Sequence, residues 1–561
     1  MYSAKVLGSF IYILPKGVDG KHTKELKDEM VKAGGIYQPK TGEYQFLFDW
    51  ENIEKLHKLA AVNKYVYMDK TYPEITINRN RVPHIRDYQV APLEYILSRR
   101  GRILLADDVG LGKTITSASY FLYTKIHYPL LIVCTASTKL QWEREFKRFD
   151  LSNKKVVVCD GIDSVHKHDA DVVIMNYDLF SYHVYKEKNH YMVSDALEDL
   201  KSMNFQGVIL DECQRMKAPS TLWNNGIRFV IDEVPNVLAL SATPIENKPI
   251  EFFNILNIIR PDIWHNYMHF AKRYCNGHEA TRYVRYNGRG HSQKYFDTSG
   301  ASNLTELYEL LKKHVMFRRI NQGTIAGLPK VAPPVVLPLR LTPAELKEYN
   351  SILNDEAEIT TRKGGTTAMG NELTKTNRLK EFAAVAKIEY VKTFLKDFLT
   401  NGGDDKIVVF TEHHVTIDAL YDTFKKYAVK FDGRVSSKKK DEAKNKFIEN
   451  KDIRIFFGQI KSAGEGLDGL QKVCNKLMYV ELPYKPTIIR QCNGRVERVG
   501  SPFEYVVVYF PILLDTIEEE IIDILVDKQT NILTVLDGGA NDTDITQQVR
   551  EVLKEKGLDI S

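Results

Sequence analysis

The sequence has few cysteines and no arrangement of them that suits a metal ion or a cross-link. Six cysteines are scattered over 561 residues. They form no CxxC pair, and no closely spaced histidines accompany them. This spacing excludes the common zinc motifs and a disulfide framework. It favours a protein that works in a reducing interior.

The chain also lacks an apolar run long enough to span a bilayer. Its first apolar stretch, Val6 to Leu14, is short, begins without a basic cluster and has no small-residue cleavage signal. We therefore predict a first β-strand there rather than a secretory leader. The compact length and the absence of nuclear-type basic runs favour a cytoplasmic protein of a prokaryote, or of a virus in its host's cytoplasm, with no membrane partner.

Neither sign of charge dominates. The 78 basic and 73 acidic side chains leave a net charge of +5, which permits a polyanionic partner without requiring one. With 43% hydrophobic and 27% charged residues, the composition is that of a globular protein rather than a disordered or fibrous one. A chain of this length divides into roughly three or four domains.

Short apolar strands alternate with amphipathic helices from about residue 84 onward. Continuous apolar runs of this kind are buried on both faces, as the strands of parallel sheets are. The pattern occurs in two blocks, so we predict an α/β protein with two parallel-sheet lobes. The predicted strands are 103–105, 130–133, 156–158, 172–174, 208–210 and 237–240 in the first block, and 407–410, 453–457, 477–480 and 505–508 in the second.

The same patterns predict the order of the domains. A small N-terminal α+β module contains helices at Lys24–Ala33 and Trp50–Val62 and a hairpin around residues 39–42. The insertion between the lobes contains a basic and aromatic stretch, 282–294, which suits contact with bases and phosphates and equally suits a solvated loop. The predicted domains are 1–75 (N-terminal module), 76–250 (first lobe), 251–335 (helical insertion), 336–535 (second lobe) and 536–561 (flexible tail).

A phosphate loop is predicted at Ala106–Thr114, between the strand 103–105 and a helix. The glycines of this AxxxGxGKT variant let backbone N–H groups close on phosphates at a helix N-terminus. Lys113 would reach the outer phosphates, and the Thr114 hydroxyl can bind Mg²⁺. Asp107 stands where the general motif has a glycine.

Two carboxylates, Asp211 and Glu212, follow the strand 208–210. We expect Asp211 to hold Mg²⁺ and Glu212 to orient the attacking water, because phosphoryl transfer depends mainly on positioning and charge neutralisation. An isolated Asp-Glu pair would more simply be an acidic loop. Its order and spacing after the phosphate loop favour the catalytic interpretation.

Ser241 and Thr243 follow the strand 237–240, and Pro244 stops the sheet. Small hydroxyl residues allow close contact at this position, which suits a segment that couples a nucleotide site to the track of a motor. A simple turn at the end of a strand would show the same residues.

Late in the chain, Gln491, Arg495 and Arg498 are spaced by four and then three residues. On a helix entered at Thr487 they share one face, and the two guanidinium groups could stabilise charge on a transferring phosphate. Gly494 lowers helix propensity by about 1 kcal/mol, which indicates close approach to the backbone. A solvated helix face does not explain this glycine.

In their order along the chain, these motifs resemble those of superfamily-two helicases. The sequence resembles the Swi/Snf branch through Asp108–Thr114, the run 317–319 and Glu481–Pro486. The resemblance covers residues 84 to about 535 and implies two RecA-like lobes that hydrolyse ATP and move along DNA. Relatives of this kind usually translocate on duplex or branched DNA without processive unwinding.

Within that branch, Arg273–Asn276 and Ser299–Leu307 are similar to the annealing helicases, the group with HARP domains. The hairpin Tyr37–Phe48 is similar to a HARP module. Two departures concern motor coupling: Gly469 interrupts the expected Gly-Leu-Asn-Leu pattern, and Cys213-Gln214 replaces the commoner Gly-His.

The resemblance implies a site for ATP and Mg²⁺ that uses residues of both lobes, and that Gln89 reads adenine. The implied catalytic residues are Lys113, Asp211, Glu212, Arg495 and Arg498, with Thr114 and Asp211 on the metal. The other implied nucleotide-binding residues are Asp108, Gly110, Leu111, Gly112 and Gln491, and the coupling residues are Ser241, Thr243, Gly466 and Asp468.

A nucleic-acid track needs hydroxyls and backbone donors for phosphates more than it needs base readers. We expect about half of the candidate side chains to touch nucleic acid, because each could also be an ordinary surface residue. The candidates are Ser137, Lys139, Lys217, Arg318, Arg319, Thr411 and Ser462.

The sequence therefore predicts a monomeric, DNA-dependent ATPase that remodels or anneals branched DNA. The ATP residues cannot distinguish tracks, so a motor on RNA or on a transcription complex stays open. A non-hydrolysing nucleic-acid clamp that kept the fold is a further alternative, against which the complete set of catalytic residues argues.

Overall fold

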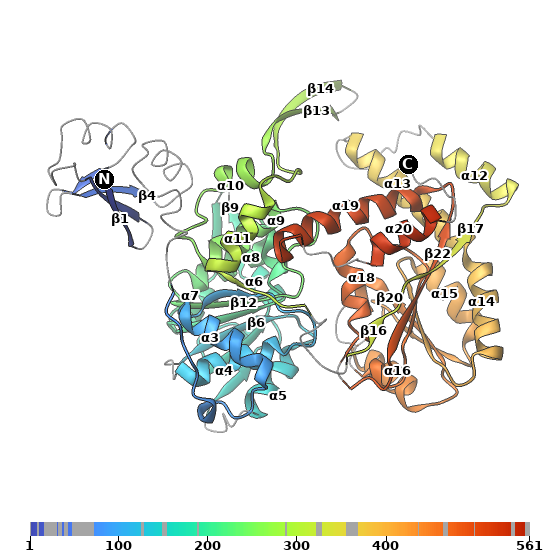
Figure 1. The fold of residues 1–561 in the computed structure, drawn as a ribbon, viewed down its shortest axis with the longest axis horizontal. Helices are drawn as coiled ribbons and strands as arrows, with labels where there is room; N and C mark the ends of the chain where they lie inside the picture. Colours follow the sequence, from blue (N-terminus) through green and yellow to red (C-terminus); the bar gives the residue numbers. More distant parts are fainter. Residues whose placement is uncertain are drawn as a thin grey trace. The chain divides into compact units, whose positions relative to one another are not determined.

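The protein is described here from a computed structural model, drawn in Figure 1. The chain divides into two compact units: 1–278 with 298–320 and 534–538, and 279–297 with 321–533 and 539–561. The structure describes residues 2–7, 10–15, 31, 36–38, 43–47, 72–124, 128–148, 154–187, 190–286, 289–320, 328–354, 368–435, 437–463, 469–498, 500–539 and 545–555.

The first unit is built on a parallel sheet of seven strands in the order β15-β5-β12-β11-β6-β8-β7. All of its strands except the two-residue β15 coincide with predicted strands, and β15 is too short to show a pattern. The strands are β5 (Arg102–Leu105), β6 (Leu130–Cys134), β7 (Val156–Val158), β8 (Val172–Asn176), β11 (Gly207–Asp211), β12 (Asn236–Leu240) and β15 (Met316–Phe317).

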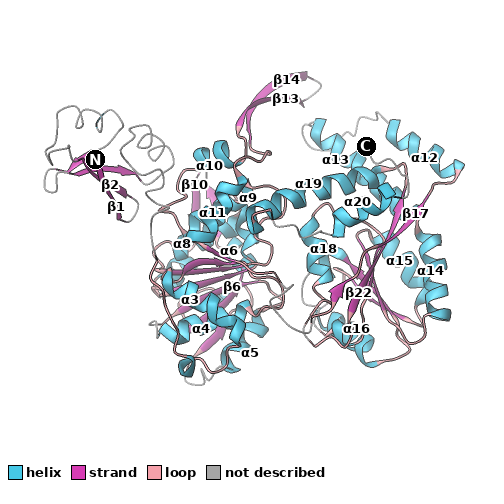
Figure 2. Cartoon of the chain, viewed as in Figure 1, coloured by secondary structure: helices cyan, strands magenta, loops and turns pink. Residues whose placement is uncertain are grey.

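Helices cover both faces of this sheet (Figure 2). Ile103 and Leu105 of β5 belong to a buried cluster shared with α3 (Val90–Ser98), α4 (Lys113–Thr124) and α5 (Lys139–Arg148). Leu104 lies between them and is also buried, on the opposite side of the pleat. The other helices are α6 (Tyr177–Ser181), α7 (Asp195–Lys201), α8 (Leu222–Ile231), α9 (Ile250–Ile259), α10 (Tyr267–Tyr274) and α11 (Leu304–His314).

The second unit contains another parallel sheet, in the order β16-β22-β21-β18-β20-β19, and β17 pairs with β22. The four predicted strands of this lobe are confirmed as β18, β20, β21 and β22. The strands are β16 (Lys330–Val331), β17 (Val335–Leu339), β18 (Ile407–Thr411), β19 (Ala428–Phe431), β20 (Ile455–Gln459), β21 (Lys476–Tyr479) and β22 (Tyr505–Leu513).

Alternate residues of one strand enter two separate cores in this unit. Val408 and Phe410 belong to one buried cluster, and Ile407 and Val409 belong to another. This explains why the run 407–410 is apolar throughout. Helices α14 (Ile388–Asn401) and α15 (His414–Phe424) cover one face; α12 (Pro343–Asn354), α13 (Ala368–Ala386), α16 (Ser437–Glu449), α18 (Pro486–Asn493), α19 (Ile517–Asp537) and α20 (Ile545–Glu555) contribute to the other.

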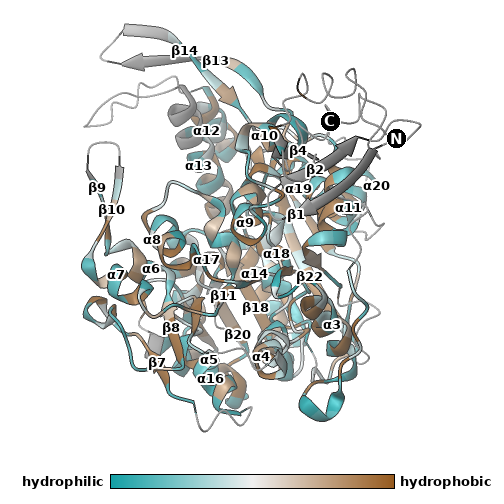
Figure 3. Cartoon of the chain, turned by 90° about the vertical axis from the view of Figure 1, so that its left-hand side faces the viewer, coloured by the Kyte–Doolittle hydropathy of each residue, from teal (hydrophilic) through white to brown (hydrophobic). Residues whose placement is uncertain are grey.

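The predicted fold class, two parallel-sheet α/β lobes, is confirmed. Figure 3 shows hydrophobic residues concentrated in strands of both sheets, including β11, β18 and β20. None of the helices within the described ranges is long and apolar enough to cross a membrane. All six cysteines are buried and free.

The N-terminal strands form a separate antiparallel sheet in the order β1-β2-β4-β3. The prediction of one strand up to Leu14 was wrong, because β1 (Tyr2–Leu7) and β2 (Phe10–Pro15) pair antiparallel. Gly-Ser between them is a hairpin signal that the apolar run concealed. The predicted hairpin is present as β3 (Ile36–Gln38) and β4 (Glu43–Leu47). Apart from Val31, the two predicted helices lie outside the described residues.

Two further segments differ from prediction. The basic stretch in the insertion forms a hairpin of β13 (His278–Tyr286) and β14 (Arg289–Asp297) rather than a loop, because Asn-Gly is a strong turn signal. The predicted flexible tail contains α20, whose Val549 and Leu553 are buried in a core. Another hairpin, β9 (Val184–Glu187) and β10 (His190–Val193), was not predicted.

Candidate nucleotide site

Three neighbouring strands bring the predicted nucleotide residues to one edge of the first sheet. In the parallel register, Leu105 of β5 lies beside Leu240 of β12, and Leu240 lies beside Asp211 of β11. The phosphate loop, the segment after β12 and Glu212 therefore leave the sheet at the same level. Ligand sites of open α/β sheets lie at this carboxyl edge.

The phosphate loop connects β5 to α4, which begins at Lys113. Gly110 and Gly112 have φ angles of +90° and +76°, in the region that favours glycine. The Lys113 ammonium donates hydrogen bonds to the carbonyl oxygens of Asp107, at 2.8 Å, and Asp108, at 3.2 Å. A phosphate in the loop would offer this ammonium stronger, charged acceptors.

Gln89, which the resemblance implies reads adenine, is buried against this loop. Its Nε2 donates to the carbonyl oxygen of Gly112 at 3.2 Å, and its Oε1 accepts from the backbone N–H of Arg86 at 2.9 Å. A Cβ atom on residue 112 would lie 2.5 Å from Gln89 Nε2. The backbone angles of Gly112 favour glycine, and a larger residue there would also displace the end of the Gln89 side chain.

Asp107, which replaces a glycine of the general motif, is buried in an ion pair with Arg319. The guanidinium donates to its carboxylate from Nη2 at 2.5 Å and from Nε at 3.2 Å. The carbonyl oxygen of Arg319 also accepts from the backbone N–H of Asp108 at 3.0 Å. Burial raises the pKa of Asp107, and Arg319 opposes this effect. Arg319 thus supports the phosphate loop from inside the unit.

Asp211 and Glu212 supply the two predicted carboxylates. Asp211 Oδ2 accepts from Trp142 Nε1 at 2.8 Å, and Oδ1 accepts from the backbone N–H of Glu212 at 3.1 Å. Burial and then the neighbouring Glu212 raise the pKa of Asp211, while Trp142 and Lys113 lower it. The Asp211 carboxylate and the Thr114 hydroxyl are oxygen donors of the kind that Mg²⁺ prefers, so the chemistry of these residues fits that ion.

Glu212 has a strained backbone, with φ 52° and ψ 51° in the left-handed region. For a residue other than glycine this costs about 1–3 kcal/mol, and such strain clusters at functional sites. Its carboxylate accepts a hydrogen bond from Gln214 Nε2 at 2.7 Å. Gln214, which replaces the commoner histidine, therefore contacts the predicted water-orienting group.

Two aromatic residues hold Asp211, and sequence reasoning gave neither a role. Besides the Trp142 contact, the Tyr177 hydroxyl donates to the carbonyl oxygen of Asp211 at 2.7 Å. Their shared partner is visible only in three dimensions.

The predicted coupling residues Ser241 and Thr243 are buried directly after β12. Ser241 Oγ accepts a hydrogen bond from the backbone N–H of Thr243 at 2.9 Å. Ser241 also donates its own backbone N–H to the carbonyl oxygen of Leu105 at 3.3 Å. The segment is therefore tied to the strand that leads into the phosphate loop.

Arg318 connects the phosphate loop to the segment after β12 within the first unit. Its Nη1 donates to the carbonyl oxygens of Ala106, at 2.9 Å, and Ala242, at 3.1 Å. Its Nε and Nη2 form a bidentate ion pair with Asp537, at 2.7 and 3.0 Å. With its side chain only 3% exposed, Arg318 is committed to contacts inside the unit rather than displayed to a track.

The other track candidates of the first unit differ in exposure. Ser137 is exposed just before α5. Lys139 is buried and donates to Asp160 at 3.0 Å, and Lys217 forms an ion pair with Glu246. Of these three candidates, Ser137 is exposed, whereas Lys139 and Lys217 form ion pairs within the first unit.

In the second unit, Thr411 ends β18 and is fully buried. Ser462, in α17 (Ile460–Ala463), is half-buried and donates to Gln459 Oε1 at 3.3 Å. Gly466 and Asp468 lie outside the described residues.

The prediction of one helix through Gln491, Arg495 and Arg498 was wrong. Helix α18 ends at Asn493, and Gly494 is its C-cap. The chain then continues through turns in which Arg498 Nε donates to the carbonyl oxygen of Gly494 at 2.7 Å. Gly494 has φ −62° and ψ −2°, so its backbone conformation does not require glycine, but the low helix propensity of glycine favours an end to the helix here. All three polar residues are half-buried.

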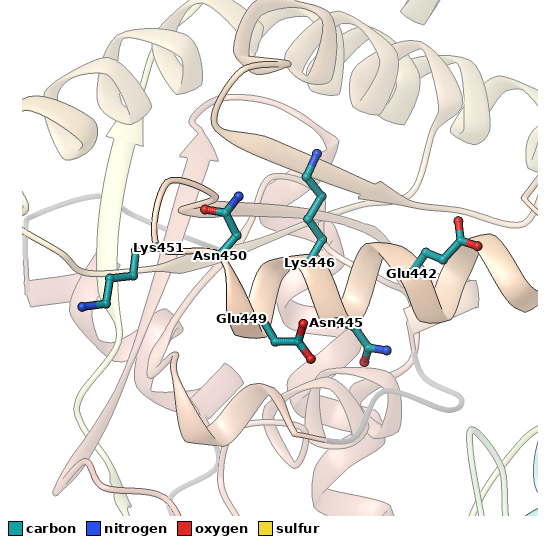
Figure 4. Close-up of a pocket in the computed structure, with 6 residues that line it drawn as sticks. All are labelled: Glu442, Asn445, Lys446, Glu449, Asn450 and Lys451. Atoms are coloured by element: carbon teal, nitrogen blue, oxygen red, sulfur yellow. The ribbon is translucent and has the colours of Figure 1, made fainter.

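A shallow hollow on the second unit lies along α16, and none of the predicted site residues lines it (Figure 4). Its lining carries both signs of charge and shows no convergence of side chains on one point. The residues that line it are Glu442, Asn445, Lys446, Glu449, Asn450 and Lys451.

Comparison with known proteins gives two domain matches. The SNF2-related domain matches residues 88–387, which is more than half of the chain, and the helicase conserved C-terminal domain matches residues 386–500. The first match contains the phosphate loop and both carboxylates. The second contains Gln491, Arg495 and Arg498.

Individual relatives are more distant. The DNA annealing helicase and endonuclease ZRANB3 of Mus musculus is 29% identical over 426 residues, covering 74% of this chain and 37% of that protein. The SWI/SNF-related matrix-associated actin-dependent regulator of chromatin subfamily A-like protein 1 of Drosophila melanogaster is 25% identical over 510 residues, covering 86% of this chain and 62% of that protein. The chain thus spans less than two thirds of the length of either relative.

Among solved structures, the Sulfolobus solfataricus SWI2/SNF2 ATPase core in complex with dsDNA is 21% identical. The match covers 87% of this chain and 98% of that one, with a TM-score of 0.37. At this score the likeness adds nothing to the fold, which is defined by the two sheets themselves.

Proposed function

Because the chain belongs to the SNF2-related family, we propose that it is an ATP-dependent DNA translocase similar to the annealing helicases. In this proposal it hydrolyses ATP with residues of both lobes and remodels duplex or branched DNA in replication, repair or recombination. The observation that supports this most is the register of the first sheet, which sets the phosphate loop and Asp211 at one edge.

Each residue at that edge has a chemical task in the proposal. Lys113 binds the outer phosphates, and Glu212 orients the attacking water and accepts its proton. Asp211 and Thr114 would hold Mg²⁺, which when bound neutralises phosphate charge. Gln89, fixed against Gly112, contacts the adenine.

The second lobe contributes charge in the proposal. Arg495 and Arg498 stabilise the negative charge that develops on the transferring phosphate, as guanidinium groups do in related phosphoryl-transfer sites. Gln491, which lies in α18, assists in nucleotide binding. These assignments rest on the match to the helicase C-terminal domain.

DNA is proposed as the track because the relative ZRANB3 is named a DNA annealing helicase. Ser137 is exposed and can bind a phosphate directly. The elements that carry the remaining candidates contact the track through backbone N–H groups and hydroxyls, which bind phosphates without reading sequence.

The proposal is tested by measuring ATP hydrolysis with single-stranded, duplex and forked DNA and with RNA. Duplex or forked DNA is expected to stimulate hydrolysis most. Stimulation by RNA alone would favour a motor on RNA or on a transcription complex. Binding of nucleic acid without hydrolysis under any of these conditions would favour a clamp.

The mechanism is tested with Glu212→Gln, which keeps the size of the side chain and removes its basicity. Hydrolysis should fall at least about 100-fold, while DNA binding is retained. Glu198→Gln, at an exposed position on α7, is the matched control and should hydrolyse ATP like the parent. A Glu212→Gln variant as fast as the parent would refute the assigned role.

A further inference from the structure

We propose that Trp142 is a positioning residue that orients Asp211 and links the start of α5 to the metal site. The inference rests on the proposed function and deepens it. It names a coupling element between a nucleic acid bound near Ser137 and the carboxylate that would hold Mg²⁺.

The topology of the first sheet brings this indole to the site. Strand β6 lies directly beside β11, and α5 follows β6 in the chain. Trp142 is buried on α5, and its Nε1–H reaches Asp211 Oδ2 at 2.8 Å. The phosphate loop approaches from the other side of β11, beyond β12. Asp211 therefore stands between the nucleotide loop and the indole.

An indole N–H suits this task chemically. It is a hydrogen-bond donor only and cannot be deprotonated under ordinary conditions, so it holds the carboxylate in one orientation. The other oxygen of Asp211 accepts the backbone N–H of Glu212 at 3.1 Å. Donors that hold a metal-binding carboxylate in this way orient it, and losing one typically weakens metal binding or activity by about 10- to 100-fold.

The carboxylate depends on Trp142 because the other aromatic partner does not hold its oxygens. Tyr177 donates to the backbone carbonyl of Asp211, which fixes the main chain and leaves the side chain to turn. Packing explains only part of the environment of Trp142: its ring lies 6.2 Å from that of Phe146 between centroids. That contact would be equally satisfied by a phenylalanine without an N–H group.

A short chain of hydrogen bonds joins the indole to the exposed end of α5. Ser137 Oγ and Thr138 Oγ1 both bond Thr135 Oγ1, at 2.9 and 3.0 Å. The backbone N–H of Trp142 donates to the carbonyl oxygen of Thr138 at 3.0 Å. A phosphate that binds Ser137 would compete for its hydroxyl, rearrange this turn and move the first turn of the helix that carries the indole.

The first experiment compares Trp142→Phe with Trp264→Phe. Trp264 is also buried in the first unit, but within the described chain its Nε1 has no hydrogen-bond partner, so the same substitution there removes packing alone. The affinity for Mn²⁺, used as a spectroscopic substitute for Mg²⁺, is measured by electron paramagnetic resonance with a non-hydrolysable ATP analogue. Trp142→Phe should bind Mn²⁺ about 10- to 100-fold more weakly, and Trp264→Phe within about twofold of the parent. Equal affinities in both variants would overturn the positioning role.

The second experiment keeps Trp142 and replaces Trp50, Trp223 and Trp264 with phenylalanine, so that fluorescence reports this indole alone. Duplex DNA, added without metal or nucleotide, should change the emission, and Ser137→Ala should abolish that change. Mn²⁺ with the ATP analogue should quench the emission. Emission that DNA leaves unchanged would overturn the link to α5, and emission that Mn²⁺ leaves unchanged would overturn the placement beside the metal.

These readouts separate the inference from the proposed function. If the parent protein hydrolyses no ATP with any nucleic acid, the proposed function fails, while Mn²⁺ affinity and Trp142 emission still decide the positioning role. If Trp142→Phe does not fold, the variant with Trp142 as its single tryptophan still decides it.

Discussion

Each unit has a carboxylate near the end of a central parallel strand, but the two carboxylates have different hydrogen-bond donors. Asp211 ends β11 in the first unit and accepts hydrogen bonds from an indole and a backbone amide. Glu481 follows β21 in the second unit and accepts from the backbone N–H of His413 at 3.2 Å and from its Nδ1 at 2.5 Å. The first carboxylate has neutral donors, and the second has a histidine that is a cation when protonated.

The pKa directions follow from this difference. Burial, and then Glu212, raise the pKa of Asp211. Burial is the largest effect on Glu481 and raises its pKa, but the hydrogen bonds and charge of His413, together with Lys387, outweigh burial and hold the pKa of Glu481 below its usual value. A site that binds a metal with its nucleotide needs a carboxylate whose charge is not already neutralised. A carboxylate with only a structural role stabilises the fold more when a nearby cation neutralises its charge.

The largest effect is expected from Asp211→Asn. Hydrolysis of ATP should fall by about 1000-fold, because an amide is a poor ligand for Mg²⁺. The thermal midpoint should stay constant or rise, since the raised pKa means that folding disfavours the charge on Asp211. A steady-state assay and a melting curve check both outcomes. A marked fall in the midpoint would make Asp211 a structural carboxylate like Glu481.

Arg319→Gln sharpens the comparison within the first unit, because Asp107 has a built-in cation there. Removing Arg319 leaves a buried carboxylate without its ion pair, so the first unit should lose about 3 kcal/mol of unfolding free energy. The double variant Asp107→Gly/Arg319→Gln should recover most of that loss. Urea unfolding measures both. A double variant no more stable than Arg319→Gln would contradict this account.

Glu481→Gln should act on stability and much less on chemistry. It removes the charge that His413 binds, and the second unit should lose about 2 kcal/mol. DNA-stimulated hydrolysis at a temperature where the variant is folded should stay within about threefold of the parent. A loss comparable to that of Asp211→Asn would assign Glu481 to catalysis instead.

The smallest effect is a pH dependence of the second unit. The pKa of His413 is raised from 6.5, chiefly by the hydrogen bond to Glu481, and Glu412 and Glu381 add to this. Its stabilisation is therefore complete below pH 6.5 and is lost as pH rises through the folded pKa. The pKa of Glu481 is lowered from 4.5, so its contribution is complete above that pH and is lost as pH falls.

The pair should therefore stabilise most between pH 4.5 and 6.5. His413→Gln should cost about 1 kcal/mol more at pH 6 than at pH 9. Urea unfolding of the parent and the variant at both pH values measures this difference. A cost that does not change with pH would show that His413 acts in its neutral form.

Sequence patterns predict features formed by residues close together in the chain, and they miss contacts between residues that are far apart in the chain. The central strands and the phosphate loop are legible because apolar runs and glycine spacing lie within a few residues. The bond between Trp142 and Asp211 joins residues 69 positions apart, and the ion pair between Arg319 and Asp107 joins residues 212 apart. Neither spacing leaves a periodic signal.

Errors in the prediction also have local causes. The face shared by Gln491, Arg495 and Arg498 assumed a continuous helix, but α18 ends at Asn493, and glycine at position 494 has a low helix propensity. Sequence reasoning singled out Arg318 and Arg319 as candidates for contact with nucleic acid. It could not show that both guanidinium groups turn inward, because burial of an arginine depends on a carboxylate elsewhere in the chain.

The first unit takes its last residues, 534–538, from the far end of the chain. Asp537 in that stretch is the carboxylate partner of Arg318, which in turn bonds the carbonyl oxygen of Ala106. A protein shortened before residue 534 would keep every nucleotide motif and still lose a support directly behind them. The first unit therefore cannot be produced by truncating the chain at one position. Loss of residues 534–538 would remove a contact that reaches Ala106, the first residue of the phosphate loop.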